Sequence, residues 1–195
     1  MKKRFLPFLM ALSLIFPTFS AFGEETVPDH TTTSASSPSV TAETAVLMDA
    51  ASGEILYDKN ADQKMFPASI TKLMTILLAL EHGELTDEIT FSHNAVYDIE
   101  PGSAHIAIQE GETLTLEQVL RAIILRSANE ASNGVAEYVD GSVEEFAKHM
   151  TARAKELGAK NTNFVNANGL HDENHYTTAY DMALIAKELL THEEY

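Results

Sequence analysis

The chain has no cysteine and no tryptophan among its 195 residues, and 29 Asp and Glu outnumber its 13 Lys and Arg. The absence of cysteine excludes disulfides and a thiolate metal site, so a folded domain must rely on its hydrophobic core alone. The formal net charge of −16 argues against a nucleic-acid partner and against direct adsorption to anionic lipid, because both would be repelled. Net charge is a property of the whole surface, so it leaves the chemistry of an individual site open.

The N-terminus carries the three parts of a secretory signal peptide. A basic start over 1–4 precedes a mostly apolar stretch over 5–19, and small residues lead up to Gly23. This arrangement predicts a signal peptide over 1–23. A membrane anchor is the alternative, but the stretch is short for a span and is broken by two prolines, at 7 and 17. We therefore expect an extracytoplasmic protein, either secreted, in the cell wall or at the outer face of the cytoplasmic membrane.

Residues 24–42 are rich in Thr, Ser, Pro and Glu, and this composition predicts a flexible linker because it cannot bury a core. One folded domain is expected over 43–195. Strand-like runs at 45–49 and 54–58 flank turn residues and predict a β-hairpin. Further elements are predicted as a helix over 69–81, a short strand over 88–91, a loop over 98–104, helices over 116–125 and 130–139, a helix that Ser142 opens and Gly158 closes, a loop over 161–174, and a helix that begins near Thr178.

The tetrad Ser69-Ile70-Thr71-Lys72 is the most informative motif, and it opens the apolar helical run. Residues i and i+3 lie on one face of a helix, so the Lys72 amine can reach the Ser69 hydroxyl and take its proton. A serine at a helix N-terminus also has the positive end of the helix dipole beside it, which favours a developing alkoxide. The pair is thus a candidate nucleophile with its own base. The spacing alone is common, so its context has to support it.

A second motif, Ser127-Ala128-Asn129, lies at the break between two predicted helices. Such a triplet is most often a loop that caps the next helix, but its hydroxyl can also relay a proton and its amide can orient a substrate. Ser-x-x-Lys followed by Ser-x-Asn is the signature of penicillin-binding proteins and serine β-lactamases. From about Glu43 onward the chain closely resembles the low-molecular-mass D-alanyl-D-alanine carboxypeptidases, especially those of Gram-positive bacteria. The segments that carry this resemblance are 45–49, 67–75, 102–103, 127–132, 161–166, 169–171 and 176–183.

This resemblance implies an α/β (α+β) domain with the fold of β-lactamases and penicillin-binding transpeptidases, in which an antiparallel sheet is joined to a helical domain. It implies that Ser69 is the acylated nucleophile, that Lys72 is its general base, and that Ser127 passes the proton to the departing D-alanine. Asn129 would hold the substrate's peptide amide. The expected substrates are peptidoglycan stem peptides, with β-lactam antibiotics as covalent inhibitors. No cofactor and no metal are expected, and membrane association is expected only through parts that this sequence does not contain.

The third motif of the family is absent, because no Lys-Thr-Gly, His-Thr-Gly or Lys-Ser-Gly occurs in the sequence. In the family, the strand that bears this motif binds the substrate's terminal carboxylate and supplies the second N–H of the oxyanion hole. We therefore expect the chain to be the N-terminal portion of a longer protein, with a fold incomplete at its C-terminus and no activity alone.

Two other functions stay open at this point. A serine β-lactamase would also use Ser69 and Lys72, but class A members typically have Asp where this chain has Ala128, and no Glu-x-x-Leu-Asn segment is present. A non-catalytic module that binds penicillin or the cell wall is the other alternative, if the chain is naturally this short.

A zinc site is not expected, although His171 and His175 lie four residues apart as in a zinc metalloprotease. That motif needs a helix and a Glu directly after the first His. Here Asp172 holds that place, and the segment follows Asn168-Gly169 in a predicted loop.

Overall fold

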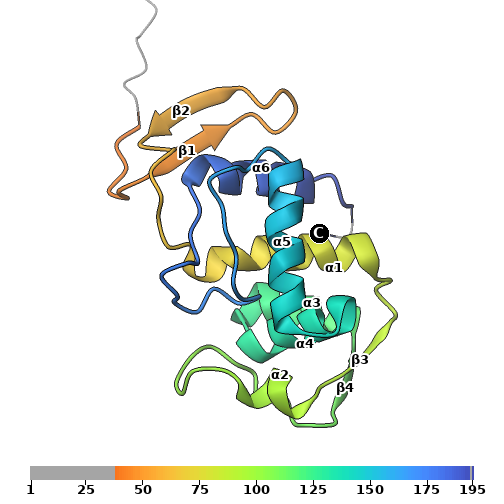
Figure 1. Ribbon diagram of the computed structural model, residues 1–195. Helices are drawn as coiled ribbons and strands as arrows, with labels where there is room; N and C mark the ends of the chain where they lie inside the picture. Colours follow the sequence, from red (N-terminus) through yellow and green to blue (C-terminus); the bar gives the residue numbers. More distant parts are fainter. Residues whose placement is uncertain (1–37, 194) are drawn as a thin grey trace, which may run out of the picture. The chain divides into compact units, whose positions relative to one another are not determined.

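The computed structural model describes residues 38–193 and 195. Its strands are β1 (Ala45–Met48), β2 (Ile55–Lys59), β3 (Glu88–Thr90) and β4 (Thr113–Thr115), and its helices are the 3-10 turn η1 (Ala68–Thr71), α1 (Lys72–His82), α2 (His93–Tyr97), α3 (Leu116–Arg126), α4 (Asn129–Asp140), α5 (Val143–Glu156) and α6 (Ala179–Leu189) (Figure 1). The predicted signal peptide and most of the predicted linker lie outside the described residues. Within the described residues, no helix combines the length and the apolar character needed to cross a membrane.

The predicted hairpin is confirmed. β1 and β2 pair antiparallel, with Leu47 opposite Tyr57 and an irregularity in register after Leu47. The turn is closed by the Asp49 carboxylate, which accepts hydrogen bonds from the N–H and the hydroxyl of Ser52, and by Gly53 at a φ of +79°. Figure 1 shows the hairpin above α6, and β1 packs against that helix.

Helix α1 is the centre of the fold. It packs against α3, α4, α5 and α6, and its residues Met74, Leu77 and Leu78 are completely buried. The sequence predicts one helix over 69–81, whereas the structure divides this segment into η1 and α1 at Lys72. Because apolar side chains surround α1, the helix is buried on several sides, as its sequence predicts.

Helices α3, α5 and α6 start at side-chain caps. Thr115 and Gln118 form a complete capping box at the start of α3, while Ser142 and Thr178 accept from backbone N–H groups at the starts of α5 and α6. These caps satisfy N–H groups that have no partner within the helix. The predicted helices of this region are therefore confirmed within a residue or two at their starts.

A second two-stranded antiparallel sheet, β3 with β4, covers the far end of the helical part. Strand β3 was predicted, but β4 and the five-residue helix α2 were not. Helix α2 is capped by Ser92, whose hydroxyl accepts from the Ala95 N–H. Five residues are too few to show a helical period, so α2 leaves no clear pattern in the sequence.

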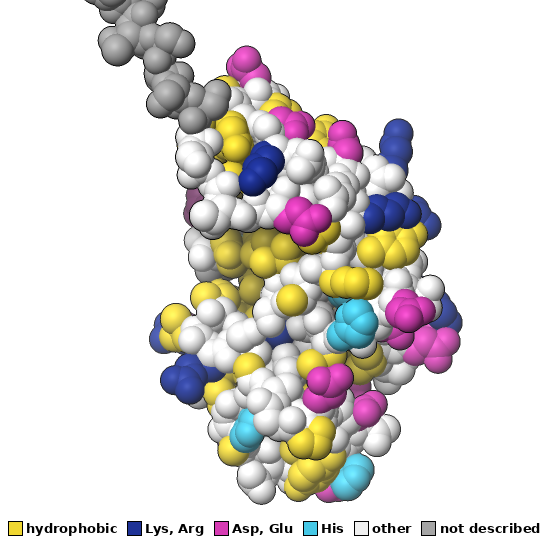
Figure 2. Space-filling model, turned by 90° about the vertical axis from the view of Figure 1, so that its left-hand side faces the viewer, with side chains coloured by type: hydrophobic (Ala, Val, Ile, Leu, Met, Phe, Trp, Pro, Cys, Tyr) yellow, Lys and Arg dark blue, Asp and Glu magenta, His cyan; other side chains and the backbone are white. Residues whose placement is uncertain are grey.

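Several large hydrophobic side chains stay exposed on the described part. They include Leu47 and Leu56 on the hairpin and Phe66 and Ile70 on either side of Ser69. Figure 2 shows hydrophobic side chains lining a hollow on the face that lies on the left in Figure 1. Exposed apolar side chains that gather on one face often mark a contact area.

Candidate active site

The candidate nucleophile lies in a strained turn ahead of α1. Ser69 is the second residue of η1 and is exposed. Ala68 before it has a φ of +48°, which is unfavourable for a residue with a Cβ. Gly169 packs directly against this point, since a Cβ on Gly169 would lie 1.9 Å from the Ala68 carbonyl oxygen. The loop that contains Gly169 therefore supports the turn that presents Ser69.

Lys72 begins α1 and is only 4% exposed. Its Nζ donates to Ser69 Oγ at 3.4 Å, to Asn129 Oδ1 at 2.8 Å and to the Asn168 carbonyl oxygen at 2.6 Å. These three acceptors match the three N–H groups of an ammonium ion. When Lys72 is neutral, the two carbonyl oxygens can still only accept, whereas the Ser69 hydroxyl can donate. The lone pair of the neutral amine is therefore directed at Ser69.

Burial also makes the neutral form of Lys72 accessible. Desolvation lowers its pKa from 10.5 to about 8, and the negative charge of Glu130 opposes part of this change. With that pKa, about one lysine in ten is neutral at pH 7, against fewer than about one in a thousand for an ordinary lysine. A general base works best when its pKa is near the working pH, so burial prepares Lys72 for this role.

The second motif turns sharply between two helices. Ser127 ends α3 in the left-handed conformation, with a φ of +56°, and Asn129 begins α4. The Ser127 hydroxyl is buried, and no described residue hydrogen-bonds to it. Ser127 lines a cavity of about 230 Å³ together with Ser69 and Lys72. The structure thus brings the four candidate residues together, three around one cavity and Asn129 through its contact with Lys72.

The two histidines of the zinc-like spacing have different surroundings. His171 stacks edge-on against Phe66 with 4.6 Å between ring centroids. His175 is buried, with Nε2 2.7 Å from the Thr71 hydroxyl and Nδ1 accepting from the Val165 N–H. Desolvation lowers the pKa of His175 to about 4. No group of three His, Cys, Asp or Glu that could hold a metal ion occurs within 38–193 and 195.

Sequence reasoning gave no role to Asn168, Gly169 and Glu130, which complete the surroundings of Lys72 and Ser69. The pair Asn168-Gly169 indicates a turn, but its contacts with η1 and Lys72 depend on tertiary packing. Glu130 directly follows Asn129 and is 1% exposed. A charged residue at the start of an amphipathic helix is normally solvated, so its burial had no sequence signal.

The described part has the fold of the penicillin-binding transpeptidases, as solved structures show. D-alanyl-D-alanine carboxypeptidase DacD from Francisella tularensis aligns with a TM-score of 0.76 at 31% identity, covering 81% of this chain and 39% of that one. Penicillin binding protein 5 from Haemophilus influenzae aligns with a TM-score of 0.73 at 36% identity, covering 79% and 46%. The predicted fold class is confirmed.

The family follows from the sequence comparisons. A family model described as D-alanyl-D-alanine carboxypeptidase (Peptidase_S11) matches residues 31–195, and the chain belongs to this family. This chain is 45% identical to D-alanyl-D-alanine carboxypeptidase DacF of Bacillus subtilis over 157 residues, and the alignment covers 78% of this chain. The chain spans 40% of the length of DacF and of the next curated relatives. The resemblance inferred from the motifs is confirmed.

Proposed function

We propose that this chain carries the nucleophile-bearing part of a serine-type D-alanyl-D-alanine carboxypeptidase. The enzyme would remove the terminal D-alanine from peptidoglycan stem peptides through an acyl-enzyme on Ser69. The observation that carries this proposal is the environment of Lys72, whose pKa is about 8 and whose neutral lone pair is directed at Ser69 Oγ, 3.4 Å away. Membership of the family supports the same function.

The proposed reaction begins when neutral Lys72 takes the hydroxyl proton of Ser69. As this proton leaves, Ser69 Oγ forms a bond to the carbonyl carbon of the penultimate D-alanine. The Ser69 N–H donates no hydrogen bond within residues 38–193, so it can donate to the developing oxyanion. Ser127 then relays the proton to the nitrogen of the departing D-alanine as the C–N bond breaks. Water finally hydrolyses the ester and restores the Ser69 hydroxyl.

Asn129 has two parts in this proposal. Its Oδ1 accepts from Lys72 at 2.8 Å and fixes the direction of the amine. Its amide nitrogen makes no hydrogen bond with the described residues, so it can donate to the peptide carbonyl of a substrate. One side chain would therefore align both the base and the bond to be cut.

The second oxyanion donor is not supplied by a recognisable motif, because the sequence has no Lys-Thr-Gly. The family resemblance implies that a strand with this motif provides the donor and binds the terminal carboxylate. One such donor is worth about 3–4 kcal/mol of transition-state stabilisation. We infer that the 195-residue chain alone does not turn over, and that activity requires this strand.

Proteins of this family act outside the cytoplasm, and the domain organisation that we propose agrees with that location. We infer a signal peptide over 1–23, a linker over 24–42 and the catalytic segment from 43 onward. β-Lactam antibiotics would acylate Ser69 in place of the stem peptide.

A chimera tests the function directly. Residues 43–195 would replace the matching segment of Bacillus subtilis DacF, whose remaining part would supply whatever this chain lacks. The chimera is incubated with a fluorescent penicillin and with a D-alanyl-D-alanine peptide, while the intact mass and free D-alanine are followed. We expect a long-lived adduct on Ser69 and release of D-alanine.

The same experiment separates the alternatives. An adduct that disappears rapidly would make the chain a serine β-lactamase part. A folded chimera that forms no adduct and releases no D-alanine would make it a non-catalytic module and would refute the proposal. The native DacF protein serves as the positive control, and the chimera with Ser69→Ala serves as the negative control.

A further inference from the structure

A buried carboxylate next to the site has no part in the reaction above. Glu130 is the second residue of α4 and is 1% exposed. Its Oε1 accepts from the Ile106 N–H at 2.7 Å, while its Oε2 is buried without a hydrogen-bond partner among the described residues. Burying an ionised carboxylate is costly unless its charge is balanced. Its position therefore calls for a physical explanation.

The first turn of α4 holds the loop over 103–107. The Asn129 N–H donates to the Ala104 carbonyl oxygen at 2.9 Å, and the Ile106 N–H donates to Glu130. The other hydrogen bonds that these five residues make within the described part connect them to neighbours in the same loop. The two contacts to α4 are thus what ties this loop to the residues around Lys72.

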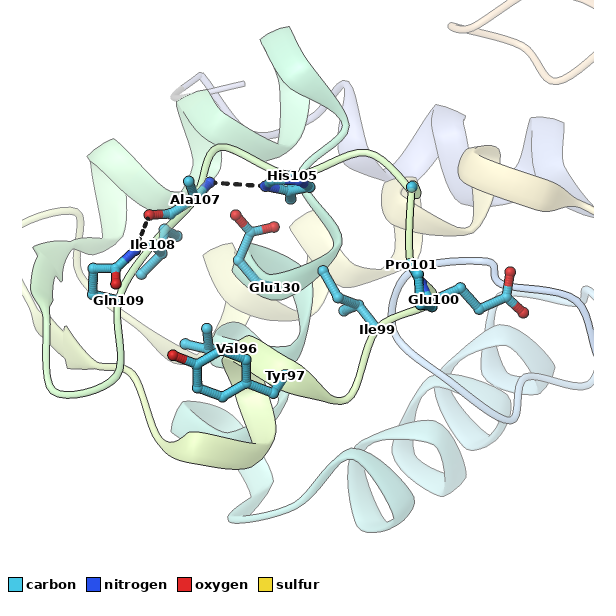
Figure 3. Close-up of a pocket in the computed structure, with 11 residues that line it drawn as sticks. Val96, Tyr97, Ile99, Glu100, Pro101, His105, Ala107, Ile108, Gln109 and Glu130 are labelled. Carbon is cyan, nitrogen blue, oxygen red and sulfur yellow. Dashed lines mark hydrogen bonds between the residues drawn. The ribbon is translucent and has the colours of Figure 1, made fainter.

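Figure 3 shows how Glu130 is placed. Its carboxylate points toward the part of the loop that bears His105 and Ala107, and it faces a cavity of about 320 Å³ that Val96 and Tyr97 also line. Hydrophobic side chains share this wall with Glu100, His105 and Gln109, so the carboxylate faces a mixed apolar and polar surface.

Glu130 is also the charged group that acts on Lys72. Its charge raises the pKa of Lys72 against the effect of burial. Around the amine, η1 contributes Ser69, α4 contributes Asn129, and the loop after α5 contributes the Asn168 carbonyl, all uncharged. Beyond Thr71, His175 is neutral near pH 7 because burial lowers its pKa to about 4.

We propose that Glu130 is a positioning residue that clamps the 103–107 loop to α4 with one oxygen and balances the buried ammonium of Lys72 with its charge. It would keep Asn129 in contact with Lys72 and set how readily Lys72 gives up its proton. The functional meaning of this tuning rests on the proposed function. The clamp and the charge balance can be measured without any turnover.

The charge balance is tested with Glu130→Gln, in which an amide oxygen can still accept from Ile106. The pKa of Lys72 is measured by NMR titration of its side-chain Cε and Nζ signals in the full chain. Because the charge of Glu130 raises the pKa of Lys72, we expect this pKa to fall by about 1 when the charge is removed. Glu117→Gln on the exposed side of α3 is the control and should leave it unchanged. An unchanged pKa in Glu130→Gln overturns the charge balance.

The clamp is tested with Glu130→Asp, which keeps the charge but withdraws the carboxylate by one methylene. Hydrogen exchange of the Ile106 amide should become at least about tenfold faster in this variant and stay near the parent rate in Glu130→Gln. Equal exchange in all three proteins overturns the clamp. Neither measurement needs acylation, so their failure leaves the carboxypeptidase proposal standing, and an inactive chimera leaves the clamp standing.

Discussion

Replacing Gly169 by alanine should disable Ser69 without touching a reacting atom. The new Cβ would lie 1.9 Å from the carbonyl oxygen and 2.4 Å from the carbonyl carbon of Ala68, which is the residue before Ser69. Both are backbone atoms, so no side-chain rotation can relieve the overlap. Because a carbon and an oxygen in contact lie about 3.5 Å apart, the turn or the loop must move by more than about 1 Å.

The size of the effect has two parts. The φ of +88° at Gly169 disfavours any residue with a Cβ by about 1–2 kcal/mol. Displacement of a catalytic group by about 1 Å can cost a factor of about 10² in rate. We therefore expect Gly169→Ala to slow acylation by about 10²-fold, together with a loss of stability of about 2–4 kcal/mol.

Gly141→Ala is the matched control, because Gly141 has a similar φ of +77° but a Cβ there would meet no atom within 4 Å. Both variants are compared in the DacF chimera by the rate of adduct formation with fluorescent penicillin and by thermal melting. The control should lose stability through backbone strain alone and keep the parent acylation rate. If Gly169→Ala acylates as fast as Gly141→Ala, the support that this loop gives to the nucleophile turn is refuted.

Three further predictions concern titration and the proposed roles in the same chimera. Ser69→Ala should abolish labelling with an unchanged melting temperature, and peptide mapping of the parent adduct to another serine would contradict the assignment. Lys72→Arg should slow acylation by at least about 10²-fold, because arginine stays protonated. In the parent chimera, the acylation rate should rise with pH through about 8 as Lys72 becomes neutral. A rate that does not change with pH in this range would exclude Lys72 as the base. His175 has a lower pKa folded, about 4, than its ordinary 6.5. The unfolded chain therefore binds more protons between these values, and stability should fall by up to about 3 kcal/mol as pH drops from 6.5 to 4; His175→Gln should flatten this part of a denaturation series.

Sequence reasoning succeeded where the information is local. The spacing of Ser69 and Lys72 places both side chains on one side of a helical turn, and their contact at 3.4 Å agrees with it. The hairpin over 45–58 and the start of α6 at Thr178 likewise depend on turn and cap residues beside them. These features are encoded in windows of a few residues, so a single sequence is enough to predict them.

The features of the site that the sequence did not predict depend on contacts between distant segments. The Asn168 carbonyl reaches Lys72, and Gly169 reaches Ala68, only because the loop after α5 folds back onto η1. Likewise, His175 is buried, and its ring hydrogen-bonds with the Thr71 hydroxyl. Neither periodicity nor capping patterns record which loop approaches which turn, so these neighbours became visible only in three dimensions.

The change of helix type at Lys72 has a consequence for alignment. In a 3-10 turn, positions three apart are eclipsed along the axis, whereas in an α-helix they differ by about 60° around it. Ser69 belongs to η1 and Lys72 starts α1, so the winding of these four residues sets the angle between hydroxyl and amine. Rewinding η1 as one more α-helical turn would change the angle between the Ser69 and Lys72 side chains by about 60° around the axis, with no change in the sequence. Reactivity at this site is thus sensitive to helical winding. A substitution outside the motif that favours the α form would slow acylation by changing the angle between the hydroxyl and the amine.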